Sequence, residues 1–567
     1  MQIIKVLGWI QKNIRHPLFL IFLLALVLRL YKLGEFPYGF HADEVRVGWN
    51  AYSILKTGAD DRGNKFPLYY NTFGDYRPTG IFYVTIPSLI IFGRNEFAVR
   101  FPSALLGALT VFPLYLLIKE ISKNRKLEIS NSSLEIPAAL LLAISPWHIS
   151  VSRATSEVVI SLFLSLFGVY FFLKGLKSSS LRHYVFSFLF LAISYFFYHS
   201  IRLLAPLYLI TIIVHFWPTI KNYWSKKYIM GTLFILLAFT LVLALNKQAL
   251  GRFTQVSIFN DLDAKYELSR SREEEQAILR TIFTKIFHNE PVIYAKHFLN
   301  NYLSYFSGNF LIGYDAKPLR YVTPGIGLLT YGEFLLFLVG LFLSIRKKEN
   351  SLVFYLLLVA PIPAALTIED APNLHRSLFM LPFLLIFESY ALAYLARKKL
   401  LAKLALVGLA LNAVYFVHMY LVHSLIHKPY YQVYKEREPD SPAFRNIGAK
   451  ELAFDLEKNK QIFEKIVVSN FPDDPYPWYA FFTGKDPKEF NPYALKRELG
   501  LWSYQNIVFS NTRCPSDYAL QDQKFKVLAV DSWPCPYESK IKDGLKAKIV
   551  GKIKRPDSSE VYIFLSN

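Results

Sequence analysis

The chain has 567 residues, of which 53% are hydrophobic and 16% aromatic, and its mean hydropathy is +0.26. This composition excludes an ordinary soluble enzyme of this size and is typical of a protein with many membrane-spanning segments. The formal net charge of +21 does not predict nucleic-acid binding, because the Lys and Arg residues fall in short clusters between apolar runs, which is the topology signal of membrane proteins.

Apolar runs long enough to cross a hydrocarbon core of about 30 Å recur along the chain. They predict about eleven transmembrane helices. The runs lie at 15–32, 97–118, 134–151, 155–173, 183–200, 202–217, 228–246, 324–345, 351–367, 375–395 and 400–422. The first run resembles a signal peptide, but no small-residue cleavage site follows it, so we interpret it as the first spanning helix.

Clusters of Lys and Arg fall on alternate sides of consecutive predicted helices, so all of them can be cytoplasmic at once. The clusters are Lys5/Lys12/Arg15, Lys119/Lys123/Arg125/Lys126, Lys174/Lys177/Arg182, Lys221/Lys226/Lys227, Arg346/Lys347/Lys348 and Arg397/Lys398/Lys399/Lys403. The sequence therefore predicts a multi-pass plasma-membrane protein with a cytoplasmic N-terminus and an extracytoplasmic C-terminal domain.

Two further apolar segments are too short to span a membrane. Residues 79–92 contain Pro87, and a crossing there would place Arg125 and Lys126 outside, against the charge rule. We interpret this segment as an interfacial or re-entrant helix and residues 45–55 as a juxtamembrane helix lying along the surface.

A long polar loop at 247–323 is predicted on the outer side. It contains a charged helical run at 270–280, followed by apolar residues with helical spacing, namely Ile278, Ile282, Phe283 and Ile286. This spacing predicts a folded amphipathic helix rather than disorder.

Residues 425–567 read as a small α/β domain that follows a transmembrane domain at 1–424. The pattern predicts a helix at 441–458 and strands at 465–469, 506–510, 525–530 and 561–565. Cys514 and Cys535 are the two cysteines of the chain and can form a disulfide outside the cell. Two cysteines exclude a cysteine-ligated zinc site as an organising feature.

Acids, histidines and arginines recur at the outer ends of the predicted helices, where bundling can bring them to one cavity. A carboxylate at the water–membrane boundary stays ionised and can accept a proton, and arginine binds phosphate oxygens bidentately. The candidates are Asp43, Glu44, Asp75, Arg77, His148, Arg153, Glu157, His199, Arg202, His375 and Arg376.

The order of short motifs between about residues 20 and 380 resembles the protein O-mannosyltransferase superfamily, which includes the lipid A aminoarabinose transferases. The motifs are Asp43-Glu44, Arg77-Pro78, Arg100-Phe101-Pro102-Ser103-Ala104, Ser145-Pro146-Trp147-His148 with Ser152-Arg153, and Tyr198-His199-Ser200-Ile201-Arg202. The chain has Arg77-Pro78-Thr79 where the family usually has a lysine followed by two prolines. The charge is retained and the second proline is absent.

This resemblance implies a mainly α, polytopic GT-C fold and a transferase that moves a sugar from a polyprenyl phosphate to an acceptor hydroxyl at the outer membrane face, with inversion. It implies that Asp43 is the base, with Glu44 beside it. The partners would be the lipid-linked donor, the bilayer and an acceptor protein, lipid or glycan, as in protein mannosylation or cell-envelope synthesis. The other candidate residues would bind the donor phosphate and sugar.

Each candidate also has a structural interpretation. Asp43 can cap the helix that starts near Val45, and the interfacial arginines can be membrane anchors. Glu157 can pair with Arg153 one turn away. A divalent metal near Asp43 and Asp75 stays open, because the histidines lack close ligand spacing.

Two other functions compete with sugar transfer. A transporter or flippase of lipid-linked sugars predicts charges near the bilayer midplane and paired broken helices, whereas here the charges lie at the outer ends. A non-catalytic scaffold with a binding domain leaves the first-loop acids without a task and predicts that Asp43→Asn does no harm.

Overall fold

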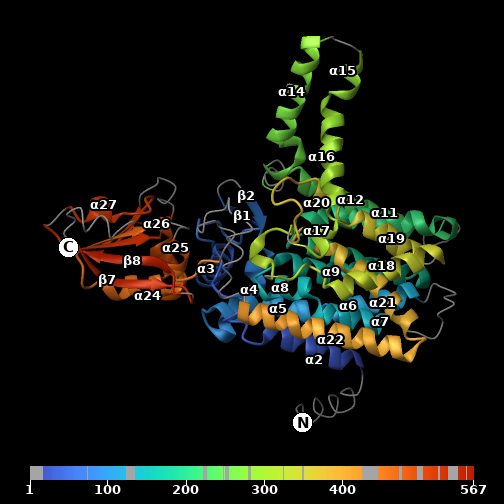
Figure 1. The fold of residues 1–567 in the computed structure, drawn as a ribbon, viewed down its shortest axis with the longest axis horizontal. Coiled ribbons are helices and arrows are strands. Elements are labelled where there is room, and N and C mark those ends of the chain that lie inside the picture. Colours follow the sequence, from blue (N-terminus) through green and yellow to red (C-terminus); the bar gives the residue numbers. More distant parts are fainter. Residues whose placement is uncertain are drawn as a thin grey trace.

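The computed structural model describes residues 17–72, 75–122, 134–220, 226–246, 248, 255–278, 282–313, 315–323, 325–347, 350–423, 445–470, 475–494, 502–521, 524–533, 535, 547–556 and 558–567. A bundle of helices forms one part of the molecule, and a small domain with a β-sheet lies beyond one end of it (Figure 1). The boundary predicted at residue 425 falls outside the described residues.

Each of the eleven apolar runs is helical in the structure. The helices are α2 (Pro17–Leu30), α5 (Glu96–Leu109) with α6 (Val111–Ser122), α7 (Glu135–Ile144) with α8 (Pro146–Arg153), α9 (Glu157–Ser178), α10 (Leu181–Ser194), α11 (Ser200–Ile220), α12 (Lys226–Ala244), α18 (Tyr331–Arg346), α19 (Ser351–Val359) with α20 (Ile362–Ala365), η3 (Leu378–Met380) with α21 (Leu381–Leu395), and α22 (Lys399–Val422). Six helical segments of the described chain are long and apolar enough to cross a membrane. The predicted polytopic helical fold is confirmed.

Three predicted runs are each broken into two α-helices, and a fourth, at 375–395, contains the short 3-10 helix η3 before α21. In the run at 134–151, the break falls at Ser145, because Pro146 has no N–H to donate and begins a new helix at its first position. The Ser145 hydroxyl accepts the backbone N–H of His148 at 3.4 Å and caps α8. The break sets the 146–153 segment apart from the spanning helix before it.

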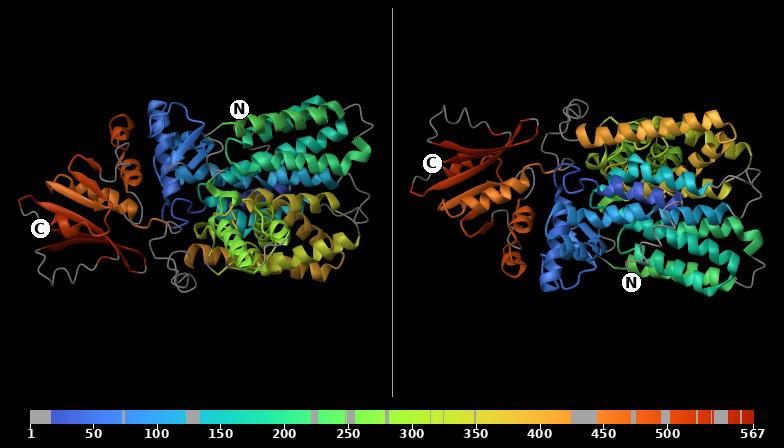
Figure 2. Two further views of the ribbon diagram at one scale, coloured as in Figure 1. Left: turned by 90° about the horizontal axis from the view of Figure 1, so that it is seen from above. Right: turned by 90° about the horizontal axis from the view of Figure 1, so that it is seen from below.

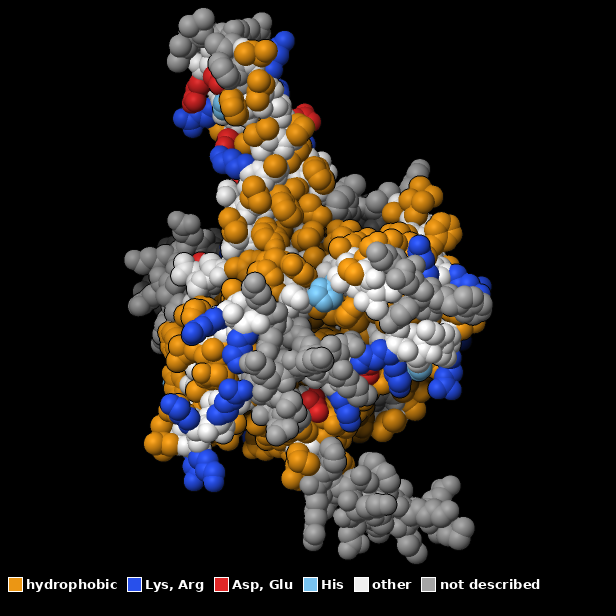
Figure 3. Space-filling model, turned by 90° about the vertical axis from the view of Figure 1, so that its right-hand side faces the viewer, with side chains coloured by type: hydrophobic (Ala, Val, Ile, Leu, Met, Phe, Trp, Pro, Cys, Tyr) orange, Lys and Arg blue, Asp and Glu red, His pale blue; other side chains and the backbone are white. Residues whose placement is uncertain are grey.

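The bundle helices run side by side, and the two ends of the bundle differ (Figure 2). The C-terminal domain lies beyond one end. The opposite end carries many Lys and Arg side chains and few acidic ones (Figure 3). This distribution is the one that the positive-inside rule predicts for a cytoplasmic end.

A layer of short elements lies between the bundle and the C-terminal domain. It contains α3 (Ala42–Thr57), the antiparallel hairpin β1 (Tyr69–Thr72) and β2 (Asp75–Pro78), and α4 (Gly80–Phe92). The 13 residues of α4 extend about 20 Å, which is short of a hydrocarbon core. Both short segments predicted to lie at the surface are therefore helices of non-spanning length.

The loop after α12 folds into a helical hairpin that projects sideways from the bundle (Figure 1). Its elements are η1 (Ile258–Asn260), α14 (Leu262–Ile278), α15 (Ile282–Phe287) and α16 (Glu290–Ser304), followed by α17 (Gly308–Leu311) and η2 (Leu319–Tyr321). The predicted amphipathic helix across 278–286 includes residues 279–281, which lie outside the described residues; on either side of them the chain is helical, in α14 up to Ile278 and in α15 from Ile282. The side chains of Ile282 and Ile286 are 70% and 49% exposed.

The C-terminal domain is a six-stranded mixed sheet with the strand order β4-β5-β3-β6-β8-β7. Its elements are α24 (Ala449–Asn459), β3 (Lys465–Ser469), α25 (Tyr476–Thr483), α26 (Pro487–Ala494), β4 (Trp502–Tyr504), β5 (Ile507–Ser510), α27 (Ser516–Ala519), β6 (Val527–Ser532), β7 (Lys548–Lys554) and β8 (Glu560–Ser566). All four predicted strands are present. Cys514 and Cys535 form a disulfide.

Close packing of α18 on α21 gives a testable stability prediction. A Cβ atom at Gly340 would lie 1.8 Å from the carbonyl oxygen of Phe387, so Gly340→Ala forces the two helices apart. We expect a loss of about 1–3 kcal/mol or more, measured as a lower melting temperature in detergent. Gly408→Ala in α22 is the control, because nothing lies within 4 Å of its added Cβ and alanine favours helix. Equal melting temperatures for the two variants would contradict the packing.

Candidate active site

The candidate site begins at the N-terminus of α3, directly after the first helix and its connecting turn. His41 is the N-cap, since its Nδ1 accepts the backbone N–H of Asp43 at 3.1 Å, and the Glu44 carboxylate accepts the backbone N–H of His41 at 3.0 Å. This is a capping box. The structural alternative for Asp43 is therefore wrong: the helix begins at Ala42, His41 caps it, and the Asp43 side chain is available for another role.

The Asp43 carboxylate lies among cationic groups. Its Oδ1 is 3.2 Å from Nη1 of Arg77, and its Oδ2 accepts a hydrogen bond from Nη2 of Arg320 at 3.4 Å. The Nδ1 atom of His41 lies 3.6 Å from Oδ2. Burial alone would raise the pKa of Asp43, but Arg77, His41, Arg320 and Arg46 outweigh it and hold this pKa well below its usual range. Asp43 is therefore an ionised carboxylate at neutral pH, and its side chain is 32% exposed.

Glu44 has the opposite environment, because its side chain is only 4% exposed and its contacts are all internal. Arg100 donates to it through Nε at 2.9 Å and Nη2 at 3.2 Å, and the backbone N–H of Thr155 donates at 3.2 Å. Arg445 of the C-terminal segment forms an ion pair with it. Burial raises the pKa of Glu44, but Arg100 and Arg445 reverse the shift and lower it. Glu44 thus holds three parts of the chain together beside Asp43.

Arg320 reaches Asp43 from a loop that pairs with the segment before α21. The carbonyl oxygen of Lys317 accepts the N–H of Leu374 at 2.7 Å, which places η2 beside His375. The His375 ring stacks on Tyr321 with ring centroids 4.9 Å apart, and its Nε2 lies 2.8 Å from the hydroxyl of Ser156, the residue before α9. This region forms the second wall of the site.

His375 is neutral at physiological pH. Burial, together with Arg320 and Arg376, lowers its pKa to about 3. Glu157, the first residue of α9, lies within electrostatic range of Asp43, Arg77 and Arg320. The structure thus brings five residues from distant parts of the sequence into one cluster, called here the Asp43 cluster: Asp43, Arg77, Glu157, Arg320 and His375.

Two other candidates hold the hairpin that carries Arg77. The Nε2 of His199 donates to the carbonyl oxygen of Tyr76 at 2.9 Å, and the guanidinium of Arg202 lies 5.3 Å from the centre of the Tyr69 ring, a cation–π distance. Tyr69 is on β1 and Tyr76 on β2. The side chain of Asp75, on β2, lies outside what the structure describes.

Three candidates bind other parts of the protein. His148 Nδ1 lies 2.9 Å from Nη2 of Arg29. Arg153 donates to the carbonyl oxygens of Leu28, Tyr31 and Phe36 at 2.8–3.1 Å. Arg376 forms an ion pair with Glu369 and donates to Thr367 Oγ1 at 2.7 Å. The first two join α2 to α8, and the third closes the loop before α21. We assign these three residues to the framework around the site.

Sequence analysis missed Arg320 and Arg445. Arg320 lies in the outer loop that was recognised, within Leu319-Arg320-Tyr321, but no spacing links it to Asp43, which is 277 positions away. Arg445 follows residues outside the described part of the chain and lies 401 positions from Glu44. Arg100 was quoted only as part of a motif. Only the fold brings these residues together.

The described surroundings of Asp43 do not fit a divalent metal, because both carboxylate oxygens face arginine side chains. Among the described residues, Cys514, Asp531 and Cys535 form a cluster with metal-ligating atoms close together. The two sulfur atoms of that cluster are bonded to each other, so they do not offer thiolates to a metal.

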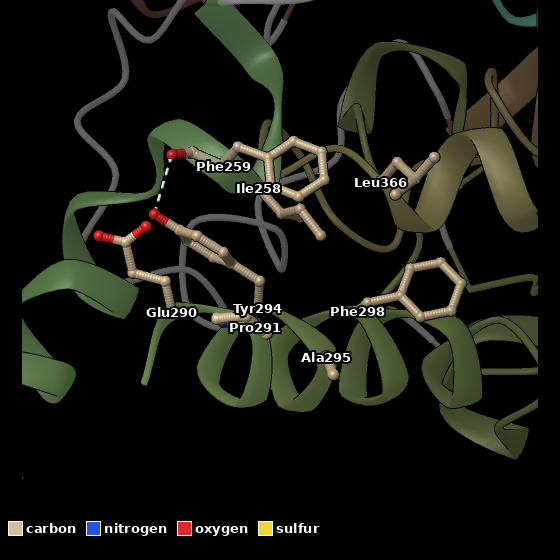
Figure 4. A pocket seen from close by; sticks show the side chains of 8 residues that line it. All are labelled: Ile258, Phe259, Glu290, Pro291, Tyr294, Ala295, Phe298 and Leu366. Carbon is tan, nitrogen blue, oxygen red and sulfur yellow. Dashed lines mark hydrogen bonds between the residues drawn. The ribbon is translucent and has the colours of Figure 1, made fainter. Parts of the chain in front are cut away.

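A separate apolar pocket lies at the base of the helical hairpin (Figure 4). It has a volume of about 420 Å³ and is formed by η1, α16 and the end of the α20 turn. Its lining residues are Ile258, Phe259, Glu290, Pro291, Tyr294, Ala295, Phe298 and Leu366. None of them belongs to the Asp43 cluster, so this pocket and the cluster are distinct features.

The chain is similar to known proteins in part of its sequence and in its fold. Residues 76–244 match the family described as dolichyl-phosphate-mannose-protein mannosyltransferase. The apo structure of ArnT from Cupriavidus metallidurans aligns with a TM-score of 0.52 at 11% identity, over 99% of this chain and 98% of ArnT. ArnT bound to undecaprenyl phosphate aligns with a TM-score of 0.49 at 13% identity, over 98% of each chain.

A second relative is longer than this protein. AglB, an oligosaccharyltransferase from Archaeoglobus fulgidus solved with an inhibitory peptide and a dolichol-phosphate, aligns with a TM-score of 0.47 at 14% identity. The alignment covers 84% of this chain, which spans 64% of AglB. No curated protein matches the chain by sequence.

The alignment with apo ArnT extends over nearly the whole of both chains and shows a membrane protein with the GT-C glycosyltransferase fold. The family match begins at Tyr76 on β2, includes Arg77 and extends through α12. Together they confirm the predicted resemblance to the protein O-mannosyltransferase superfamily.

Proposed function

We propose that this protein transfers a sugar from a polyprenyl phosphate to an acceptor hydroxyl, with Asp43 as the general base. The observation that supports it most is the position of Asp43: an ionised, partly exposed carboxylate in the first turn of α3, flanked by two arginines. A base and phosphate-binding cations at one point are what this reaction needs. In this proposal the site faces the outer side of the plasma membrane and the N-terminus is cytoplasmic.

The donor phosphate competes with Asp43 for its two arginines. Arg77 and Arg320 each offer a guanidinium that can bind phosphate oxygens. When they turn to the phosphate, Asp43 loses their stabilisation, its pKa rises, and it becomes a stronger base. Donor binding therefore activates the base in the same step that orients the donor.

The chemical step is a single displacement. The acceptor oxygen attacks the anomeric carbon and its proton passes to Asp43. The bond between the anomeric carbon and the phosphate oxygen breaks, and the electron pair leaves with the phosphate, whose charge Arg77 and Arg320 balance. Attack from the side opposite the leaving group inverts the anomeric centre.

The remaining cluster residues serve the sugar. Neutral His375 and Glu157 at the start of α9 offer hydrogen-bonding groups that suit sugar hydroxyls. A hexose such as mannose and a pentose both fit this chemistry, and the acceptor hydroxyl is on a protein, a lipid or a glycan of the cell envelope. A transporter of lipid-linked sugars is less well supported, because the cluster gathers at one end of the helices and not at their midpoints.

Removing either phosphate-binding charge tests this assignment. We expect Arg77→Gln and Arg320→Gln each to weaken donor binding by roughly 10–100-fold, since a hydrogen bond to a charged group contributes about 1.5–3 kcal/mol. Each variant also removes a cation that lowers the Asp43 pKa, so the acid limb of the profile of kcat/KM against pH moves to higher pH. Binding is measured with a fluorescent polyprenyl phosphate in nanodiscs.

Arg272→Gln is the matched control. Its side chain is on α14, where Nε donates to the His288 carbonyl oxygen, away from the cluster. Its donor affinity and pH profile should equal those of the wild type. Unchanged donor affinity in both cluster variants would overturn the phosphate assignment.

A further inference from the structure

The C-terminal domain docks on α3, the helix that begins beside Asp43. Trp478 of α25 donates through Nε1 to the carbonyl oxygen of Phe40 at 3.3 Å. Asn491 of α26 accepts from Trp49 Nε1 at 3.2 Å and donates to the Ser53 hydroxyl at 2.8 Å. Buried residues of α3, α25 and the sheet belong to one continuous core. The docking surface is thus broad and largely apolar.

One polar residue at the edge of this docking surface reaches the site. Arg445 is in the segment that enters the domain, and its neighbour Asn446 pairs with Phe40 in an isolated β-bridge. The Arg445 side chain is 8% exposed. Its Nη1 pairs with the Glu44 carboxylate, and its Nη2 donates to the backbone carbonyl oxygen of Arg320 at 3.3 Å.

Both contacts are to residues that adjoin Asp43. Glu44 follows Asp43 on α3, and the Arg320 guanidinium is one of the two that hold the Asp43 carboxylate. The planar fork of Arg445 therefore ties the first loop to the η2 loop. Without it, the two loops keep separate supports: Arg100 for Glu44, and the pairing of Lys317 with Leu374 for η2.

We propose that Arg445 is a positioning residue through which the C-terminal domain sets the distance between Asp43 and Arg320. The inference rests on the proposed function for its catalytic consequence, but its structural part does not. When the domain is docked, Asp43 and Arg320 are held at a fixed distance from each other. Transfer activity thereby depends on the presence of a domain whose described residues contribute no group to the reacting atoms.

Amide hydrogen exchange of the full-length protein in nanodiscs tests the structural part. In Arg445→Gln we expect faster exchange in peptides covering 40–47 and 318–323 than in the wild type. The matched control is Lys450→Gln, which removes the Lys450–Glu96 ion pair of 2.8 Å from the same docking surface without touching either loop. Unchanged exchange in Arg445→Gln, or equal acceleration in both variants, would overturn the proposal.

Sugar transfer tests the catalytic part. Arg445→Gln should lower kcat at least tenfold and leave the donor KM within about threefold of the wild-type value. The groups that bind the donor remain, but the distance between Asp43 and Arg320 is no longer fixed. In Lys450→Gln, kcat should stay near that of the wild type.

If Arg445→Gln does not fold, Arg445→Lys replaces it. This variant keeps the positive charge beside Glu44 but loses the planar fork of arginine. Its kcat should fall while its melting temperature stays close to that of the wild type. Wild-type kcat in the folded variant would overturn the inference.

The two readouts separate the two hypotheses. If the wild type transfers no sugar from any donor while exchange still accelerates selectively in Arg445→Gln, the proposed function fails and the positioning role stands. If the wild type is active and Arg445→Gln changes neither exchange nor kcat, the positioning role fails and the proposed function stands.

Discussion

Replacing Asp43 with asparagine is expected to lower the rate of sugar transfer by about 10²–10⁴-fold, the usual contribution of a general base. Asparagine keeps the shape of the side chain but cannot take the acceptor proton. Donor binding should be retained or become tighter, because Arg77 and Arg320 no longer pair with a carboxylate at this position. The measurement is single-turnover transfer from a radiolabelled donor alongside donor affinity in the same nanodiscs.

Asp263→Asn is the control for this variant. It removes an acidic charge from the first turn of α14, on the projecting hairpin, and should leave both rate and affinity unchanged. Wild-type turnover in Asp43→Asn would move the base to another residue, and the scaffold hypothesis predicts that outcome. Loss of donor binding together with turnover would assign Asp43 to binding and not to proton transfer.

Replacing Glu44 with glutamine is expected to destabilise the protein by about 3–5 kcal/mol, the usual cost of removing one partner from a buried ion pair. Arg100 is 1% exposed and Arg445 is 8% exposed, so each keeps a buried charge without its carboxylate. The effect is measured as the loss of melting temperature in detergent at pH 7. Glu96→Gln is the control, since its partner Lys450 is 42% exposed and such pairs contribute about 0–1 kcal/mol.

The effect of Glu44→Gln should depend on pH in a defined direction. The folded protein lowers the pKa of Glu44, so the carboxylate stabilises the fold above the ordinary glutamate pKa. This contribution is lost as the pH falls through the lowered pKa. The stability difference between wild type and variant should therefore shrink on acidification. A difference that grows, or a variant as stable as Glu96→Gln at pH 7, would contradict the buried-pair interpretation.

The helical part of the fold was predictable because its signal is local. A membrane-spanning helix needs a long apolar run, and each of the eleven predicted runs contains a helix in the structure. The helix directions inferred from the basic clusters stay predictions. The breaks inside three of the runs were missed, although Pro146 marks one. In the C-terminal domain, β3 was predicted with its observed bounds, whereas the two edge strands β4 and β7 were missed. β4 has only three residues, and Gly551 interrupts the apolar pattern of β7.

Part of the site was predictable from motifs and from the position of polar residues at helix ends, as for Glu157 and His375. Asp43 and Arg77 were identified through the resemblance, and the structure places them 3.2 Å apart. The motif arginine Arg153 instead donates to the end of the first helix and to the turn after it, contacts that depend on how α2 and α8 cross. Arg320 and Arg445 carry no local signal at all. Ionic contacts across hundreds of residues depend on the fold, and sequence spacing does not encode them.

The most direct test of the central claim is to follow the radiolabel of the sugar. Purified wild-type protein in nanodiscs is mixed with a panel of radiolabelled polyprenyl phosphate sugars and candidate acceptors. The account predicts that one donor is consumed, that free polyprenyl phosphate appears in equal amount, and that the label moves to the acceptor with an inverted anomeric centre. Sugar transfer would be contradicted if the protein binds a donor but cleaves it with none of the acceptors. If the protein also moves the intact lipid-linked sugar across a liposome membrane, it is a transporter.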